Sequence, residues 1–395
     1  MKKVLLPTLA LALLVVCTTA YAQNSDQGNN GNNNKLGPYR FLHTIIIPGG
    51  LAGFDISWVD SKDARYYLAN RGNAAAVPPV APNIPVIDTE RDELIDQIFL
   101  SNAPNGIVAI HRTGNGQGEP GAGTLVVGTT PNAGETSKVF FIDLDHPHAP
   151  PFAVDTGGHV DCKNPANPLL SLPCRADELA YDPKDHIILV ANDRDQDLFV
   201  SFISTENPPH VVPPSDKIFY NESTPGNPIS TGGIEQPVWN KKTGMFYLAI
   251  PATVAHPKGE VDEIDPIAMK ITRGFPTTCG PAGLALIPGQ RLMTSCGDVL
   301  DVETGTVVTT VNGVAADEIW FNSGDERVYF GRNPAFVVDA ETYKQITGAG
   351  PNGPPIPAGP THSIAADEEN NHIFIPVTGS GVLVYTDDVD KGNGR

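Results

Sequence analysis

The sequence carries few positive charges. Only 26 of its 395 residues are Lys or Arg, against 45 Asp or Glu, which gives a formal net charge of −19 at pH 7. A surplus of negative charge repels the phosphate backbone of nucleic acids and the surface of anionic membranes. The composition therefore excludes nucleic acid as a partner.

Long apolar runs are confined to the N-terminus. Two Lys residues follow Met1, and after them come the largely apolar stretch Val4–Val16 and a small-x-small motif at Ala20–Ala22. This order is typical of a signal peptide that is cleaved after residue 22. No later segment approaches the roughly 18 apolar residues that a membrane span requires. The sequence thus predicts a periplasmic or secreted protein with a signal peptide at residues 1–22 and no membrane span.

Cysteine is scarce, and one of the five, Cys17, lies in the predicted signal peptide. The remaining four are an even number in an oxidising compartment, which favours disulfides. We expect Cys162 to pair with Cys174 and Cys279 to pair with Cys296. A zinc cluster is a weaker alternative, because the sequence contains no C-x-x-C motif.

Helical periodicity of useful length is absent, and a strand-rich unit recurs instead. Each copy has an apolar strand that ends in Asp or Asn, a short charged turn, a second strand of aromatic and β-branched residues, a loop and a third strand. We count seven copies, whose first strands begin at Phe54, Gly106, Glu178, Gln236, Gly283, Glu318 and Ser363. Short antiparallel strands repeated in this way are typical of propeller blades, which have about four strands each around a central channel.

The sequence therefore predicts an all-β, seven-bladed propeller over residues 39–388, after a flexible Asn/Gly-rich leader at 23–38 and before a C-terminal tail at 389–395. The last copy lacks a fourth strand, whereas Phe41–Pro48 is an apolar strand without a blade of its own. We expect this N-terminal strand to pair into the last blade and close the ring, because closure removes two exposed sheet edges. A tandem of β-sandwiches is the alternative fold, but it leaves the sevenfold count unexplained.

The strand–loop–strand texture of Tyr66–Asn70 and Val86–Thr89 resembles the YVTN/NHL-like seven-bladed propellers of secreted bacterial proteins. The resemblance covers most of residues 39–386, although no literal YVTN occurs. It implies the propeller fold and leaves the activity open, because that family includes binding proteins, surface proteins, lactonases and lyases.

Acidic residues and one His stand where the first strand of a blade is expected to meet the channel. They are Asp55, Asp177-Glu178, Glu235-Gln236, Asp317-Glu318 and His362. Converging carboxylates repel one another unless a cation, a proton or a basic side chain lies between them. Glu178, Glu235, Glu318 and His362 are therefore candidate ligands of a divalent metal such as Ca²⁺ or Zn²⁺. Alternatively, these side chains line a solvated channel or pair with Arg residues.

Arg recurs directly after second strands, at Arg71, Arg194 and Arg332. Together with Asp55, these residues are candidates for ligand binding, since guanidinium groups hold carboxylates or sugar acids in a bidentate manner. The alternative is a structural bridge to an acid of the next blade. His159 and His256 lie in loops that we expect on the same face of the propeller.

Two functions remain open on this evidence. In the first, the protein is a monomeric exported scaffold whose channel-mouth face binds a small molecule or a partner protein. In the second, it is a divalent-metal-dependent lactonase or lyase, in which the carboxylate and His ligands hold the cation and the cation polarises a carbonyl group. The sequence does not decide whether the protein is an enzyme.

Overall fold

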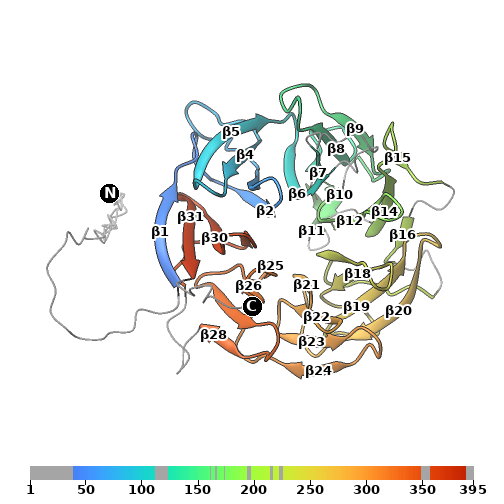
Figure 1. Cartoon of the computed structure of the whole chain (residues 1–395). Helices are drawn as coiled ribbons and strands as arrows, with labels where there is room; N and C mark the ends of the chain where they lie inside the picture. The colour runs from blue at the N-terminus through green and yellow to red at the C-terminus, as the bar shows by residue number, and fades with distance from the viewer. Residues whose placement is uncertain are drawn as a thin grey trace, which may run out of the picture. The chain divides into compact units, whose positions relative to one another are not determined.

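The computed structural model describes residues 39–111, 123–160, 162–164, 167–172, 174–193, 197–213, 217–221, 226–347 and 356–387. Within these residues, seven antiparallel sheets follow one another around a central axis and form a seven-bladed β-propeller (Figure 1). The predicted fold class and the count of seven blades are confirmed.

The blades follow the chain in order, and each has its first strand innermost (Figure 1). The first blade contains β2 (Phe54–Asp60), β3 (Arg65–Asn70), β4 (Asn83–Asp88) and β5 (Glu93–Phe99). The second contains β6 (Ala103–Ile110), β7 (Thr124–Thr130), β8 (Lys138–Asp143) and β9 (Phe152–Asp155). The third contains β12 (Leu179–Asp182), β13 (Ile187–Asn192), β14 (Phe199–Ser204), β15 (His210–Val211) and β16 (Lys217–Phe219). The fourth contains β17 (Pro237–Asn240), β18 (Met245–Ile250), β19 (Glu260–Asp265) and β20 (Lys270–Pro276). The fifth contains β21 (Leu284–Ile287), β22 (Arg291–Thr294), β23 (Asp298–Asp301) and β24 (Val307–Thr310). The sixth contains β25 (Ile319–Asn322), β26 (Arg327–Phe330), β27 (Phe336–Asp339) and β28 (Gln345–Thr347).

The seventh sheet joins both ends of the described chain. Its order is β1 (Tyr39–Ile45), β31 (Gly381–Asp387), β30 (His372–Val377) and β29 (Ala365–Ala366). In Figure 1 the blue strand β1 lies beside the red strand β31, and Ile45 is opposite Val382 in the antiparallel register. The expected closure of the ring by the N-terminal strand requires this pairing. The closure itself stays a prediction.

The Asp or Asn that ends many strands has a local structural role. After β12, the carboxylate of Asp182 accepts hydrogen bonds from the backbone N–H groups of Lys184 and Asp185, at 2.8 and 3.2 Å. Asp265 does the same for Ile267 and Ala268 after β19. Such side-chain bonds fix the backbone of a tight turn, which explains why the repeat pattern marks the strand ends well.

The apolar core lies between neighbouring blades. Every residue of the middle strand β13, with the sequence Ile-Ile-Leu-Val-Ala-Asn, is buried, because a blade on either side covers both faces of its sheet. Between the third and fourth blades, for example, Leu189 and Phe202 share one apolar cluster with Phe246 and Leu248. The stacking of blades therefore places the centre of each sheet in a core and leaves polar positions for the two ends of the channel.

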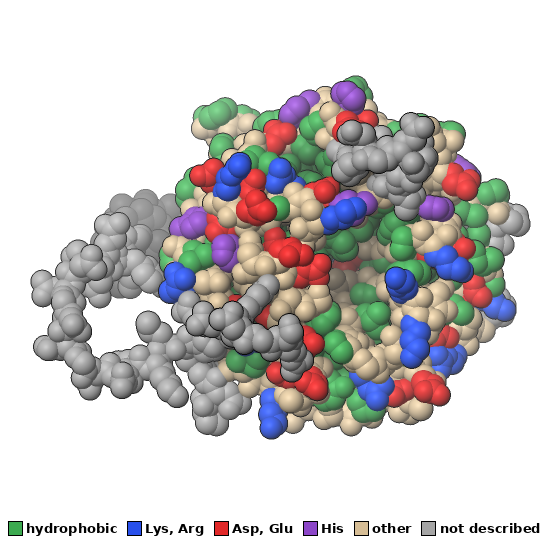
Figure 2. Space-filling model, in the orientation of Figure 1, with side chains coloured by type: hydrophobic (Ala, Val, Ile, Leu, Met, Phe, Trp, Pro, Cys, Tyr) green, Lys and Arg blue, Asp and Glu red, His purple; other side chains and the backbone are tan. Residues whose placement is uncertain are grey.

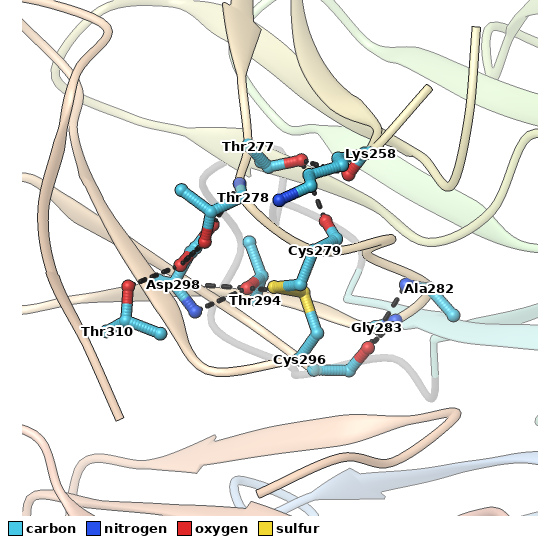
Figure 3. Close-up of a disulfide and its surroundings, with 11 residues drawn as sticks. Lys258, Thr277, Thr278, Cys279, Ala282, Gly283, Thr294, Cys296, Asp298 and Thr310 are labelled. Atoms are coloured by element: carbon cyan, nitrogen blue, oxygen red, sulfur yellow. Dashed lines mark hydrogen bonds between the residues drawn. A yellow bond between two sulfur atoms is a disulfide. The ribbon is translucent and has the colours of Figure 1, made fainter. Parts of the chain in front are cut away.

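Two disulfides tie loops to this framework, in the two pairings that the sequence predicts. Cys162 bonds to Cys174 and closes the hairpin of β10 (Cys162–Asn164) and β11 (Asn167–Leu172), and Cys279 bonds to Cys296. Beside the second bond, the buried Asp298 accepts hydrogen bonds from Thr278 and Thr310 (Figure 3). The loop before β21 is thereby held to the outer strands of the fifth blade.

Among the described residues, no helix has the length and the apolar character needed to cross a membrane.

Candidate functional site at the channel mouth

The residues that precede the innermost strands meet at one end of the channel. Asp55 of the first blade lies 3.7 Å from the Arg175 guanidinium, before the third blade, and its other carboxylate oxygen lies 3.3 Å from His362 Nε2, before the seventh blade. Asp55 and His362, which the sequence predicts at the channel mouth, thus lie close together although they belong to different blades. The space-filling view shows a hollow at the centre of the ring (Figure 2).

Close backbone packing fixes the segment that carries Arg175 and Asp177. The backbone N–H of Gly106 donates to the carbonyl of Asp177 at 3.0 Å, and a Cβ at Gly106 would lie only 2.1 Å from that carbonyl oxygen. A Cβ at Gly128 would lie 2.6 Å from the same oxygen. Glycine is therefore required at both positions, and the Cys162–Cys174 bond anchors the chain just before Arg175.

Arg175 lies at the centre of the mouth, and its side chain is only 12% exposed. Its guanidinium forms ion pairs with Asp177 and with Asp193, the latter at 2.9 Å, in addition to the contact with Asp55. Burial opposes the positive charge, but these three carboxylates raise the pKa of Arg175 above its ordinary value. Arg175 is therefore a permanent cation that joins the first blade, through Asp55, to two acids of its own third blade.

Asp55 is the best compensated acid of the group. It pairs with Arg71, which also donates to the side-chain oxygen of Asn105 at 2.8 Å, and with His362, whose ring stacks on Phe54 with centroids 4.9 Å apart. Burial alone would raise the pKa of Asp55, but the His362 hydrogen bond and the charges of Arg71 and Arg175 lower it. Asp55 is accordingly ionised.

For the other mouth acids, burial outweighs the compensation. Burial raises the pKa of Asp177 and Glu235 well above the usual range, and Asp193 raises both further, although Arg175 lowers both. Desolvation also raises the pKa of Asp317, although this residue is exposed; His362 lowers it and Asp55 adds to the rise. In the described part of the chain, these side chains therefore carry more potential negative charge than the nearby cations neutralise.

Three of the acids are close enough to share a cation. Asp177, Asp193 and Glu235 each offer one carboxylate oxygen, and these oxygens lie within 4.8 Å of one another. Oxygen donors of this kind suit hard divalent cations. Of the four metal ligands predicted from the sequence, only Glu235 is in this group. The sequence reasoning missed Asp193, although it directly precedes Arg194 and the Arg pattern had drawn attention to that position.

Glu178 and Glu318 form a separate carboxyl pair. Both are 5% exposed, and a hydrogen bond joins their side chains. Burial raises the pKa of both groups well above the usual range, and for Glu178 the charge of Glu318 adds to this effect. The pair therefore holds a shared proton rather than two negative charges.

Beyond this pair the channel widens into a cavity of about 430 Å³. Glu178, Glu318 and the three Trp residues of the chain, Trp58, Trp239 and Trp320, line it. The rings of Trp58 and Trp320 meet edge to face with centroids 5.3 Å apart. Apolar residues of the innermost strands form most of the remaining wall, so the cavity is far less polar than the mouth.

The candidate Arg residues have different surroundings. Arg71 contacts Asp55, as described above, whereas Arg332 donates to the backbone carbonyl of Ala315 at 2.9 Å and lies over the ring of Phe336. Arg194 lies outside the described residues. Arg332 thus has backbone and aromatic contacts, and among the described residues the guanidinium–acid pairs of the mouth are those of Arg71 and Arg175.

Comparisons with known proteins identify the fold. No protein-family model matches the chain, and no curated protein matches its sequence. Among solved structures, the chain is similar to the Cps50 (Swd1) beta-propeller domain of Myceliophteria thermophila, with a TM-score of 0.57 and 11% identity over 88% of this chain and 99% of that one. It is also similar to a chain of Kuenenia stuttgartiensis hydrazine synthase, with a TM-score of 0.57 and 10% identity over 87% and 97% of the two chains. At such low identity, these similarities show the propeller fold alone.

Proposed function

We propose that this protein is an exported propeller that binds a small ligand with a positively charged group at its channel mouth. The observation that carries the proposal is the gathering of carboxyl groups at Asp177, Glu235 and Asp317, whose pKa values are raised, with Asp193 beside two of them. A cationic group placed among them would lower their pKa values and relieve their mutual repulsion. An anionic ligand fits less well, because Arg71 and Arg175 are already paired with acids.

Calorimetric titration of the untagged exported protein, first treated with a chelator, tests this proposal. The probes are alkylamines and alkylguanidines, with matched alkyl carboxylates as negative controls. We expect an amine or guanidine to bind, and the double variant Asp193→Asn/Glu235→Gln to weaken binding about tenfold or more, since losing one partner of a buried charge pair costs ~2 kcal/mol or more. Glu93→Gln, at an exposed position on β5, is the control for loss of charge. Binding of carboxylates alone would overturn the proposal.

The second candidate is a divalent-metal-dependent lactonase or lyase. The specific observation in its favour is the group of three oxygens from Asp177, Asp193 and Glu235. Elemental analysis of the untreated exported protein, together with thermal melts with and without chelator, separates the two functions. Near-stoichiometric divalent metal and a chelator-sensitive melt, both lost in the Glu235→Gln variant, would favour the enzyme and direct assays to lactone and uronate substrates. A metal-free protein with an unchanged melt leaves the cationic-ligand proposal.

Export is part of this proposal. The two disulfides are compatible with an oxidising compartment. Sequencing the N-terminus of the exported protein is the direct test, and we expect it to begin at Gln23, immediately after the proposed signal peptide. Membership of the YVTN/NHL-like family and the limits 23–38, 39–388 and 389–395 are likewise proposals that rest on the sequence patterns.

A further inference from the structure

A second group of acids lies between the third and fourth blades. Glu260, Asp262 and Ile264 alternate along β19 and therefore face the same side of the sheet. Ile264 packs into the apolar cluster that contains Leu248 and Phe202. Glu260 and Asp262 thus point toward a core rather than toward solvent, and they are 2% and 0% exposed.

These two carboxylates are poorly satisfied. Within the described residues, Glu260 Oε1 and both oxygens of Asp262 have no hydrogen-bond partner. A buried polar atom without a partner costs stability, and a buried ionised carboxylate without a cation costs much more. The position therefore needs a positive charge or a proton that the surrounding apolar side chains do not provide.

An independent side chain points at the same place. Tyr220, which directly follows β16 of the third blade, is 1% exposed, and its hydroxyl also lacks a hydrogen-bond partner among the described residues. This hydroxyl lies beside Asp262, close enough for each group to affect the pKa of the other. Three buried side chains from two blades thus place oxygen atoms without hydrogen-bond partners in one region of the core.

A glycine and a partly exposed His flank the two acids. Opposite the acids on β20 stands Gly274, where a Cβ would lie 3.3 Å from both Asp262 Oδ1 and Glu260 Oε2. On the solvent side, His256 Nδ1 contacts Glu260 Oε2, and the His256 side chain is 39% exposed. His256 is therefore suited to orient Glu260 and to stand at the entrance, as hydrogen-bonding groups around metal ligands do.

We propose that Glu260, Asp262 and Tyr220 bind a hard divalent cation, for which Ca²⁺ is the probe, between the third and fourth blades. All the proposed side-chain donors are oxygen atoms, which is the donor set that Ca²⁺ prefers. The cation would neutralise both carboxylates and link two neighbouring blades. The proposal does not depend on the channel mouth, because the two sites have no residue in common.

The test uses the whole exported protein, stripped with a chelator and then dialysed against Ca²⁺. We expect the Asp262→Asn variant to bind one equivalent of Ca²⁺ less than the unmodified protein and to lose the Ca²⁺-dependent rise in melting temperature that this site causes. Glu93→Gln, at an exposed position on β5, is the control for loss of a carboxylate and should keep both. Equal Ca²⁺ binding by Asp262→Asn and the unmodified protein would overturn the proposal.

Tyr220→Phe provides a second variant in case Asp262→Asn does not fold. It removes one donor and leaves both carboxylates, so we expect Ca²⁺ affinity to fall several-fold without loss of folding. If the two acids share a proton instead of binding a cation, Asp262→Asn should melt at a higher temperature than the unmodified protein in chelator. Neither protein would then change its melting temperature when Ca²⁺ is added, and this result would overturn the proposal. Zn²⁺ binding that is lost in His256→Ala but kept in Asp262→Asn would likewise refute the assignment to oxygen ligands.

Discussion

Replacing Arg175 should expose the electrostatic balance of the channel mouth. Arg175→Met keeps a long apolar stem and removes the only group that contacts Asp55, Asp177 and Asp193 together in the described structure. Removing one partner from a buried ion-pair network costs about 3–5 kcal/mol. For a folded unit of about 350 residues, this corresponds to a melting temperature lower by roughly 4–7 °C.

The pH dependence gives this prediction a distinct signature. Without Arg175, the pKa of Asp177 in the folded protein rises further above its unfolded value of 3.8, and the pKa of Asp55 loses one of the charges that lower it. A carboxyl group with a raised pKa destabilises the fold at high pH, and the penalty shrinks as the pH falls through the folded pKa towards the unfolded one. The difference in stability between the variant and the unmodified protein should therefore be largest at pH 7 and smaller at pH 5.

Urea unfolding at both pH values measures this difference. Arg332→Ala is the matched control, because Arg332 donates to a backbone carbonyl rather than to the buried acids, and it should cost less than about 1 kcal/mol. Arg175→Lys should recover only part of the stability, because a single ammonium cannot reproduce the planar fork. A loss no larger than that of Arg332→Ala, or one that grows as the pH falls, would refute the reasoning.

Three other predictions follow from the same contacts. If β1 closes the ring, deleting residues 1–47 should abolish the cooperative melt, because β1 pairs with β31 and both Ile45 and Ile47 are buried. Deleting residues 1–37 should leave the melt unchanged, and equal melts for the two deletions would show that β1 does not close the ring. Replacing Cys279 and Cys296 by Ser should destabilise the fold by about 3 kcal/mol for a loop of this length, a loss that disappears when both proteins are melted in reductant. The double variant Glu178→Gln/Glu318→Gln should be more stable than the unmodified protein at pH 8 but not at pH 4, because raised carboxyl pKa values destabilise the folded state only at high pH. The gain at pH 8 should be about 1.4 kcal/mol for each pKa unit of the original shift. Urea unfolding midpoints at the two pH values measure this difference.

The architecture could be predicted because its signals are local. A strand that ends in Asp or Asn, such as β12 at Asp182, is followed by a turn whose N–H groups bond to that side chain, so the repeat is visible in a short stretch of sequence. The disulfide pairing was similarly local, since Cys162 and Cys174 are only 12 residues apart. Neither inference required knowledge of how distant blades face one another.

The partners within the mouth could not be predicted in the same way. The sequence grouped Glu178, Glu235, Glu318 and His362, because all stand at the start of a blade. In the structure, Glu178 pairs with Glu318, His362 pairs with Asp55, and Glu235 lies with Asp177 and Asp193. These partners come from different blades, so their choice depends on the rotation of each blade around the channel and on side-chain direction. A repeat pattern specifies neither quantity.

The Glu260 and Asp262 pair shows why burial itself carries functional information here. On sequence alone, Glu-Val-Asp-Glu-Ile-Asp is an amphipathic strand with a solvated face, and only the neighbouring third blade turns that face into an interior. The fold gains nothing from carboxylates at this position, since apolar side chains would pack there without the cost of desolvation. The same cost of desolvation applies to Asp177 and Glu235 at the mouth. Both groups of acids are therefore candidates for cation binding, and the two groups should respond independently when either is mutated.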